Sequence, residues 1–385
     1  MRHERQVEIL ERIEAAGPRR VGLFGPESMV NPASVYTDPV RFAAERRVLF
    51  REGPVFAGLS CEIPNPGDVL TATFDGLPIA VVRQADGSVA ALVNACRHRG
   101  SPLVTERVAS CGARLACPYH AWTYELDGRL AARPMSDGAF DDVTLECNLH
   151  RVAVAEKYGM IFVRPGGPTP IDVDAVLGGA EDDLGSFDLG SWHHIETRVN
   201  TWDFNWKFVL DTFCESYHIR WLHKDSLAPT FLSDCTVVES FGRNFNSIGL
   251  RKSVVEEFTK PVEERSIIPH ATIQYFLVPN ALLVHQLDHV ELWRLEPVDV
   301  HTTIATTSIF APQPATTEKA QRYWARNHDL LLQVTGTEDF PVMAAVQRSL
   351  EAGAISELVY GRVEPALTLF HRAVTEAVES GTTGL

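Results

Sequence analysis

The chain has 385 residues, of which 45% are hydrophobic and 22% charged, a composition that excludes collagen-like, disordered and small disulfide-stapled proteins. A chain of this length is expected to form two domains. The net charge of −15 argues against a nucleic-acid-binding surface, which is normally basic, and is compatible with a basic protein partner.

The sequence also predicts a cytoplasmic protein. Residues 1–17 carry too many charges for the apolar core of a signal peptide, and no apolar run is long enough to cross a membrane. The seven cysteines are an odd number and lie scattered along the chain, which fits reduced thiols or metal ligands better than a disulfide framework. We therefore expect neither a membrane nor a nucleic acid as a partner.

Residues 1–49 are expected to be helical. Val7, Leu10 and Ile13 recur near helical spacing, which predicts a short amphipathic helix, and a second helix is expected over 39–50.

Residues 50–165 differ in character, because short β-branched runs alternate with turn signals. Asp-Gly pairs at 75–76, 86–87 and 127–128 lie between such runs, and this dipeptide is a strong hairpin signal. We expect an all-β domain of many short strands.

Residues 166–385 mix both types, which predicts an α+β layout. A linker over 166–190 precedes a helix expected over 205–222. Five strands and two or three helices are then expected, the strands at 236–242, 271–279, 281–289, 290–297 and 302–312 and the helices at 316–334, 339–352 and 363–378.

The first candidate metal site consists of Cys96-x-His98 and Cys117-x-x-His120, separated by a gap of 18 residues. Each half offers one thiolate and one imidazole from a loop of the β-domain. Two cysteines and two histidines can hold a tetrahedral zinc ion or a Rieske cluster, in which the cysteines bind one iron and the histidines the other. Both alternatives remain open on the residues alone.

The surroundings of the second pair favour the cluster, since Pro118, Tyr119 and Trp122 can shield a redox centre from water. The segments CRHRG (96–100) and CPYHAWTY (117–124) resemble the signature of the Rieske domain in Rieske non-haem iron oxygenase α subunits, the aromatic-ring-hydroxylating oxygenase family. Ala121 departs from that signature, because many relatives carry glycine there. Cys111 matches no ligand position and is interpreted as structural.

The second candidate site lies in the stretch 205–223. His218 and His223, with a carboxylate, can form a facial triad that leaves open positions on Fe(II) for O2 and water. Glu215 and His218 are three residues apart and share a helix face. His223 lies about 140° further around an ideal helix, so we expect the helix to end or bulge between the two histidines.

The stretch also resembles the family's mononuclear iron motif. The resemblance implies that His218 and His223 are the two histidine ligands and that Glu215 is the carboxylate bridging the two metal sites. Many relatives carry Asp at the position of Glu215, and Glu resembles the subgroup that acts on quaternary amines.

Asp339 is the candidate third ligand. It precedes Pro341 at an expected helix start, where an acid can equally serve as a cap favoured by the helix dipole. The segment 338–350 resembles the family's third-ligand segment, which favours Asp339. Glu338 and Asp211 are the alternative ligands.

The substrate pocket is expected between the long helix and the following sheet. Aromatic walls there suit either a planar ring, by stacking, or a methylated ammonium group, by cation–π attraction. The family resemblance favours a small aromatic substrate, and Glu215 keeps hydroxylation or demethylation of a quaternary ammonium compound as the alternative. The candidate wall residues are Trp206, Tyr217, Trp221, Phe241, Phe245, Tyr275 and Phe276.

The resemblance implies an N-terminal segment (1–49) packed on the catalytic domain, a Rieske [2Fe-2S] domain (50–165) and a helix-grip catalytic domain with a curved antiparallel sheet (166–385). It further implies a mono- or dioxygenase that uses O2 and a mononuclear Fe(II). Electrons come from NAD(P)H through a reductase, with or without a ferredoxin. The chain is expected to form a homotrimer in which His120 of one subunit faces Glu215 of the next. A Rieske-type electron carrier and a zinc-binding module are the rival classes, and each leaves His218 and His223 unexplained.

Overall fold

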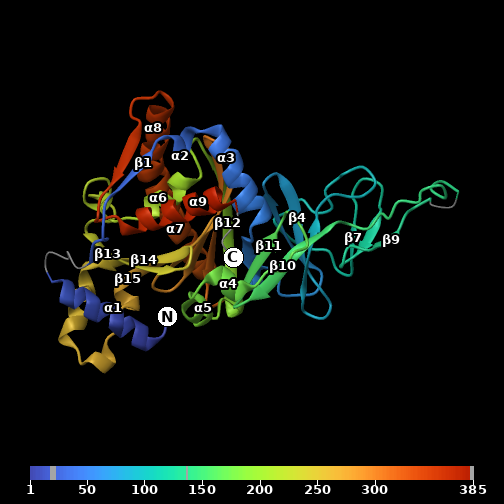
Figure 1. The fold of residues 1–385 in the computed structure, drawn as a ribbon. Helices are drawn as coiled ribbons and strands as arrows, with labels where there is room; N and C mark the ends of the chain where they lie inside the picture. The colour runs from blue at the N-terminus through green and yellow to red at the C-terminus, as the bar shows by residue number, and fades with distance from the viewer. Residues whose placement is uncertain (18–22, 136–137, 382–385) are drawn as a thin grey trace. The chain divides into compact units, whose positions relative to one another are not determined.

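The computed structural model describes residues 1–17, 23–135 and 138–381, without the side chain of Asp234. Figure 1 shows the chain in sequence colours. The sequence predicts an N-terminal segment over 1–49, a Rieske domain over 50–165 and a catalytic domain over 166–385. The backbone divides into two compact units, one made of Leu49–Val176 and Leu189–Ser191 and the other of Met1–Val48, Leu177–Asp188 and Trp192–Leu385.

The unit that begins at Leu49 is built from β-strands, as the alternation of β-branched runs and turns predicts. Its main sheet has the order β2-β11-β10-β5-β4-β3-β6, and a second sheet has the order β7-β8-β9. The strands are β2 Val55–Leu59, β3 Asp68–Phe74, β4 Leu77–Arg83, β5 Val89–Val93, β6 Val108–Ser110, β7 Arg114–Ala116, β8 Thr123–Glu125, β9 Leu130–Ala132, β10 Arg151–Lys157 and β11 Met160–Arg164.

The first Asp-Gly pair closes a two-residue hairpin between β3 and β4. Asp75 and Gly76 both have positive φ, 50° and 73°, which is the backbone that matches the twist of the flanking strands. The hairpin prediction at this position is confirmed.

The second unit contains a seven-stranded antiparallel sheet in the order β12-β18-β17-β16-β15-β14-β13, so the α+β prediction is confirmed. Two of its strands, β12 and β14, were not predicted. The strands are β12 His193–Trp202, β13 Phe231–Phe241, β14 Asn244–Arg251, β15 Ala271–Leu277, β16 Ala281–His285, β17 Val290–Asp299 and β18 Thr302–Ala311, with β1 Met29–Pro32 and β19 Glu357–Tyr360 forming a separate pair.

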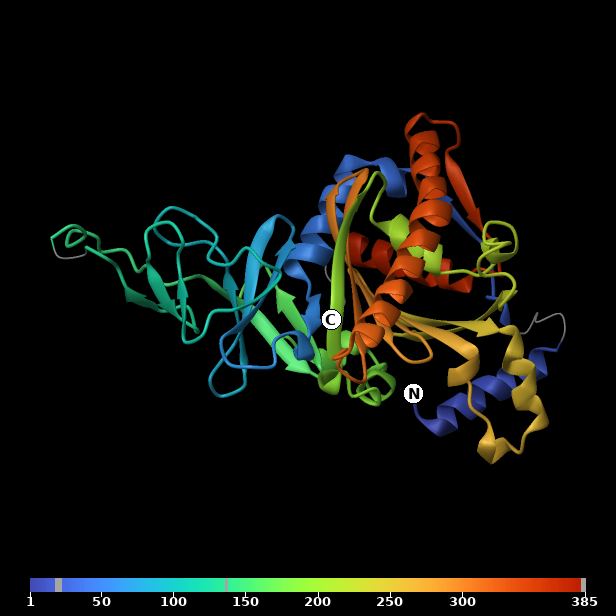
Figure 2. The ribbon, with the colours of Figure 1, turned by 180° about the vertical axis from the view of Figure 1, so that it is seen from behind.

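Helices cover this sheet. The three C-terminal helices lie at their predicted positions, with α7 against β12 and α9 against β13 and β14. A π-helical segment, Thr335–Asp339, joins α7 to α8, and the two follow one another as one continuous helical stretch (Figure 2). The helices are α1 His3–Ala16, α2 Ser34–Thr37, α3 Pro39–Glu45, α4 Val173–Leu177, α5 Glu181–Gly185, α6 Lys207–Phe213, α7 Glu318–Val334, α8 Phe340–Glu351 and α9 Pro365–Ser380.

The helix expected over 205–222 is shorter than predicted. α6 ends at Phe213, and a single 3₁₀ turn follows at His218–Arg220. Ser216 explains part of this break, because its hydroxyl accepts the backbone N–H of Cys235 and contacts the hydroxyl of Thr236, both on β13. The segment thus turns toward the sheet instead of continuing as a helix. Within the described ranges, no helix has the length and apolar character needed to cross a membrane.

Candidate metal centres and active site

The two Cys/His pairs lie in tight turns of the β-rich unit. The N–H of Gly100 donates to the carbonyl of Cys96 over 2.9 Å, and the N–H of Ala121 donates to the carbonyl of Cys117 over 3.0 Å. These turns bring the rings of His98 and His120 together, with centroids 4.6 Å apart. Ala121 has a φ of 55°, a conformation that glycine adopts without strain.

Both candidate cysteines are buried, and their sulfurs interact. Burial opposes ionisation of Cys117, but N–H groups of Tyr119 and His120 donate to its sulfur and lower its pKa. The hydroxyl of Tyr124 lies 3.3 Å from the Cys96 sulfur. Burial is the main cause of the raised pKa of Cys96.

The ring of His98 also fits a metal-binding role. Its Nδ1 atom is buried and has no hydrogen-bond partner among the described residues, although buried polar atoms nearly always have one. Trp122 stacks on the same ring with centroids 5.0 Å apart, which fixes its orientation. Two thiols and two imidazoles arranged in this way fit a [2Fe-2S] cluster with two histidine ligands.

Cys111, interpreted as structural, lies outside this group. It is half-buried at the edge of an apolar cluster, and burial raises the pKa of its thiol.

The second donor set is His218, His223 and Asp339. One ligand atom from each lies within 4.8 Å of the others. Nε2 of His223 is 2.9 Å from Oδ1 of Asp339, and Nε2 of His218 is 3.6 Å from the same oxygen. The π-helical segment Thr335–Asp339 carries the carboxylate to this point.

Carboxylates hold the outer nitrogens of both imidazoles. Nδ1 of His218 contacts Glu215, which also accepts the backbone N–H of His218 over 3.0 Å. Nδ1 of His223 lies 2.8 Å from Oε2 of Glu338. An outer carboxylate fixes the tautomer and orientation of a metal-binding imidazole, so both Nε2 atoms face the same point.

The electrostatics of this point favour a cation. Burial lowers the pKa of His223, but Asp339 and Glu338 outweigh burial and raise it. Burial likewise raises the pKa of Glu338, but hydrogen bonds from His223 and Ser226 bring it below its ordinary value.

The structure distinguishes the three candidate carboxylates. Asp339 makes no capping hydrogen bond, and its buried Oδ1 atom accepts no hydrogen bond from the described residues. Glu338 faces the outer edge of His223, while Asp211 accepts the hydroxyl of Tyr36 over 2.6 Å and lies 2.9 Å from Nε2 of His371. Only Asp339 of the three points its oxygen at both histidines.

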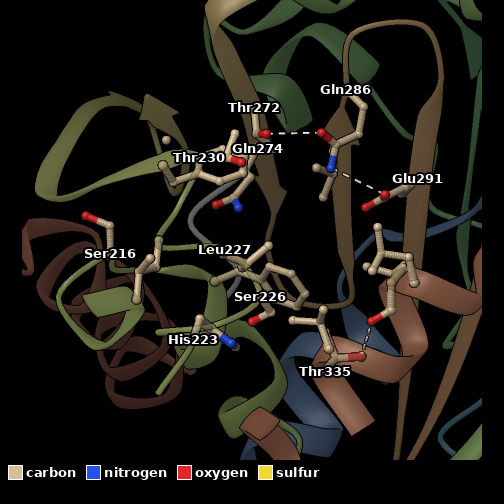
Figure 3. Close-up of a pocket in the computed structure, with 18 of the residues that line it drawn as sticks. Ser216, His223, Ser226, Leu227, Thr230, Thr272, Gln274, Gln286, Glu291 and Thr335 are labelled. Carbon is tan, nitrogen blue, oxygen red and sulfur yellow. Dashed lines mark hydrogen bonds between the residues drawn. The ribbon is translucent and has the colours of Figure 1, made fainter. Parts of the chain in front are cut away.

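A cavity of about 450 Å³ opens beside the donor set, and His218, His223 and Asp339 all line it. Figure 3 shows His223, Ser226 and Leu227 on one side of it and, on the other, Thr272 and Gln274 of β15 with Gln286, which follows β16. The sheet contributes mostly polar groups, and α7 adds Tyr323, Asn327 and apolar residues. The polar residues from the sheet are Thr236, Ser247, Arg251, Thr272, Gln274 and Glu291, and Gln286 follows β16 directly.

None of the seven aromatic residues expected on the pocket wall lines this cavity. Trp206 is buried and donates its indole N–H to Glu45. Tyr217 and Trp221 point to solvent, with exposed fractions of 51% and 68%.

The four remaining aromatics lie on the sheet but outside the cavity. Tyr275 alternates with the cavity residues of β15 and donates its hydroxyl to Asp183 on the opposite face. Phe245 and Phe276 stack on each other, with centroids 4.4 Å apart, beyond the cavity. Phe241 ends β13 and packs beside Gly179.

Sequence reasoning missed the polar residues that do line the cavity. Ser247, Gly249 and Arg251 alternate along β14, and Thr272 and Gln274 alternate along β15. This alternation of period two was the available signal. It was obscured in β14, because Asn and Gly are typical of loops.

Two protein families match this sequence, one in each unit. Residues 53–137 match the Rieske [2Fe-2S] domain, and residues 189–380 match the ring hydroxylating alpha subunit (catalytic domain). The chain belongs to the Rieske non-haem iron oxygenase α subunits. A [2Fe-2S] cluster and a mononuclear iron are the cofactors of this family, and the two donor sets described above fit them.

Relatives include the glycine betaine monooxygenase oxygenase subunit of Chromohalobacter salexigens, 37% identical over 51% of this chain and 43% of that protein. The chain therefore spans less than half the length of this relative and its Pseudomonas aeruginosa counterparts. The carnitine monooxygenase oxygenase subunit of Escherichia coli K12 is 26% identical over 85% of both chains.

Solved structures share the fold of this α subunit. A quaternary ammonium Rieske monooxygenase in complex with L-carnitine superposes with a TM-score of 0.76, covering 90% of this chain and 95% of that one at 21% identity. Naphthalene 1,2-dioxygenase with bound indole has a TM-score of 0.72 at 20% identity, covering 94% of both chains.

Proposed function

We propose that the chain is the terminal oxygenase component of a multicomponent Rieske oxygenase. It takes electrons that a reductase draws from NAD(P)H and oxygenates a small, polar, amine-bearing molecule with O2. The observation that carries this proposal is the convergence of His218, His223 and Asp339 beside a cavity, in a chain that also holds a separate Cys2His2 donor set. An electron carrier or a zinc module needs neither the triad nor the cavity.

We assign the donors as follows. Cys96 and Cys117 hold one iron of the cluster, His98 and His120 hold the other, and His218, His223 and Asp339 hold the mononuclear iron. When bound, the cluster supplies single electrons and the mononuclear iron supplies open positions for O2. Glu215 and Glu338 orient the two imidazoles.

Glu215 is also our candidate for the electron path between the two sites. Its contact with His218 supplies one half of this path within the chain. In a homotrimer, His120 of the next subunit supplies the other half. Inter-subunit electron transfer is described for one relative of known structure, a quaternary ammonium Rieske monooxygenase.

The variant Glu215→Gln tests this path, because it retains a hydrogen-bonding side chain but loses the charge. We expect both metals to stay bound and product formation to slow sharply. Normal turnover in this variant would remove Glu215 from the path. Equilibrium sedimentation tests the trimer.

The lining of the cavity supports the choice of substrate class. Most cavity groups from the sheet are hydroxyls, amides and charged side chains, which suit a polar molecule. Phe213 and Tyr323 add aromatic surface that can face a methylated ammonium group. The names of the glycine betaine and carnitine relatives support the same class. The sequence first predicted an aromatic substrate, so aromatic hydrocarbons are included in the substrate screen.

The experiment is a substrate screen with purified chain and a reconstituted reductase, reading O2 consumption and product mass. We expect coupled turnover with N-methylated amines and little with benzene or naphthalene. Preferential turnover of the hydrocarbons would overturn the substrate class, and absence of any oxygenated product would overturn the proposed activity. We also propose a cytoplasmic location, because the five cysteines that we do not assign to the cluster are free thiols. Cell fractionation tests the location.

A further inference from the structure

The charged residues that line the cavity are not equivalent. Four carboxylates face it, and each has a partner: Glu215 contacts His218, Asp339 lies beside His223, Asp288 contacts His289, and Glu291 lies 3.3 Å from Nε2 of the same His289. One cationic side chain in the lining, in contrast, has no hydrogen-bond or ion-pair partner among the described residues.

That cation is Arg251, the last residue of β14. Its Nε atom is buried, and within the described part of the chain its guanidinium has no hydrogen-bond or ion-pair partner. Burial is the cause of its lowered pKa. Arg251 is half-buried, and a guanidinium withdrawn in part from water is normally paired, because leaving its buried donor unpaired costs free energy.

The backbone holds Arg251 in this position. It faces Phe231 in the register between β13 and β14, and its guanidinium carbon lies 4.7 Å from the centre of that ring. A ring stacked on the face of a guanidinium leaves the N–H groups in its plane free to donate. Both residues line the cavity, so these donors are available to a bound molecule.

The neighbouring strand positions leave room beside these donors. Gly249 lies two residues earlier on the same face of β14, and a side chain built there would meet only the carbonyl oxygen of Thr272, at 3.9 Å. The cavity wall therefore combines an unpaired, pre-oriented cation with open space next to it. A planar anion that accepts two parallel hydrogen bonds fits such a place.

We infer that Arg251 binds a carboxylate of the substrate, which is therefore an N-methylated amino acid or another zwitterion rather than a simple amine. This inference rests on the proposed function, because it concerns the same cavity. Arg251 is a substrate-binding residue that selects for charge, and the reacting carbon of the substrate lies at the other end, toward His218 and His223.

Binding of matched probes tests the inference. Glycine betaine and carnitine are compared with their primary amides, which keep the shape and the ammonium group but lose the negative charge. Dissociation constants are measured by calorimetry on the metal-reconstituted protein. The variants are Arg251→Gln, Arg251→Lys and, as a matched control, Arg322→Gln, an exposed arginine of α7 outside the cavity lining.

We expect Arg251→Gln to weaken binding of the carboxylate probes by about 10- to 100-fold, the range for a hydrogen bond between charged groups. Arg251→Lys should recover part of the loss, and Arg322→Gln should have no effect. The amides should bind equally to all forms. Equal binding of carboxylate and amide, unchanged binding in Arg251→Gln, or no binding of any carboxylate probe to the wild-type chain would each overturn the inference.

Stability supplies a second readout. Among the described residues the guanidinium of Arg251 has only its contact with Phe231 and no hydrogen-bond or ion-pair partner, so Arg251→Gln should change the thermal unfolding midpoint little. A clear decrease would show that Arg251 serves the fold instead of a ligand. The experiments distinguish failure of the proposed function from failure of the role of Arg251. If the enzyme forms product from the amides as readily as from the carboxylates, only the role of Arg251 is wrong. Arg251-dependent carboxylate binding without product removes only the oxygenase activity.

Discussion

Nδ1 of His223 lies 2.8 Å from Oε2 of Glu338, on the ring edge opposite the Nε2 atom that faces Asp339. The two neighbouring acids thus play different parts at one imidazole. Glu338 also accepts the hydroxyl of Ser226 over 2.8 Å, which holds its carboxylate in place. One acid orients the ring and the other completes the donor set.

Removing the outer acid should loosen the iron. In Glu338→Ala, His223 loses the group that fixes its tautomer and orientation, and we expect iron affinity at this site to fall by about 10- to 100-fold. Iron retained against a chelator measures the effect, with the absorption of the cluster as an internal reference. Glu357→Ala, an exposed acid on β19, is the control. Iron retention equal to that of the wild type would contradict the role of Glu338.

A pair of Asp→Asn variants separates ligand from scaffold. Asp339→Asn should lose the mononuclear iron while the metal-free protein loses only the contact of Oδ1 with Nε2 of His223, because Oδ1 accepts no hydrogen bond from the described residues. Asp211→Asn should keep the iron but cost about 1–3 kcal/mol of unfolding free energy, since it disturbs buried contacts with Tyr36 and His371. Iron analysis and urea unfolding measure both. The reverse pattern would make Asp211 the ligand.

Tyr124 should tune the cluster. Its hydroxyl lies 3.3 Å from the Cys96 sulfur, and a hydrogen bond to a cluster thiolate favours the reduced, more negative form. We expect Tyr124→Phe to lower the reduction potential by about 20–60 mV, the equivalent of one hydrogen bond in a one-electron couple. Potentiometric titration of the reconstituted protein measures this. A potential that stays constant or rises would contradict the hydrogen bond.

The pH dependence of stability should report on His289. Burial lowers its pKa, but Glu291 and Asp288 outweigh burial and raise it above 6.5. A raised pKa means that the protonated form stabilises the fold fully below pH 6.5, and that this stabilisation disappears as the pH rises through the folded-state pKa.

The variant His289→Asn should therefore be less stable than the wild type at pH 6, and the difference should shrink toward pH 9. Urea unfolding at several pH values measures it. A difference that is constant or grows with pH would mean that His289 is neutral in the folded protein.

The sequence predicts the parts of the site that depend on local spacing. Cys-x-His and Cys-x-x-His lie in short turns, so their members are close together whatever the rest of the chain does. Helix geometry also predicts a break between His218 and His223, but α6 already ends at Phe213, before Glu215. Asp339 is over a hundred residues away, and spacing alone cannot distinguish a ligand there from a helix cap. The resemblance of its segment to the family favoured it.

The cavity wall could not be predicted, because it depends on strand register and on which side chains find partners. Tyr275 and Gln274 are adjacent in sequence, yet only Gln274 faces the cavity. No motif or spacing in the sequence distinguishes Arg251 from the other arginines. Its isolation becomes visible only when the neighbours of β14 are known.

One chain holds the donors for two different metal centres, and metal analysis with an absorption spectrum tests this assignment most directly. After anaerobic reconstitution we expect about three irons and about two acid-labile sulfides per chain, with the colour of an iron–sulfur protein. The double variant His218→Ala/His223→Ala should keep the colour and the sulfide and lose one iron. A colourless zinc protein, or an iron content that the double variant leaves unchanged, would contradict the account.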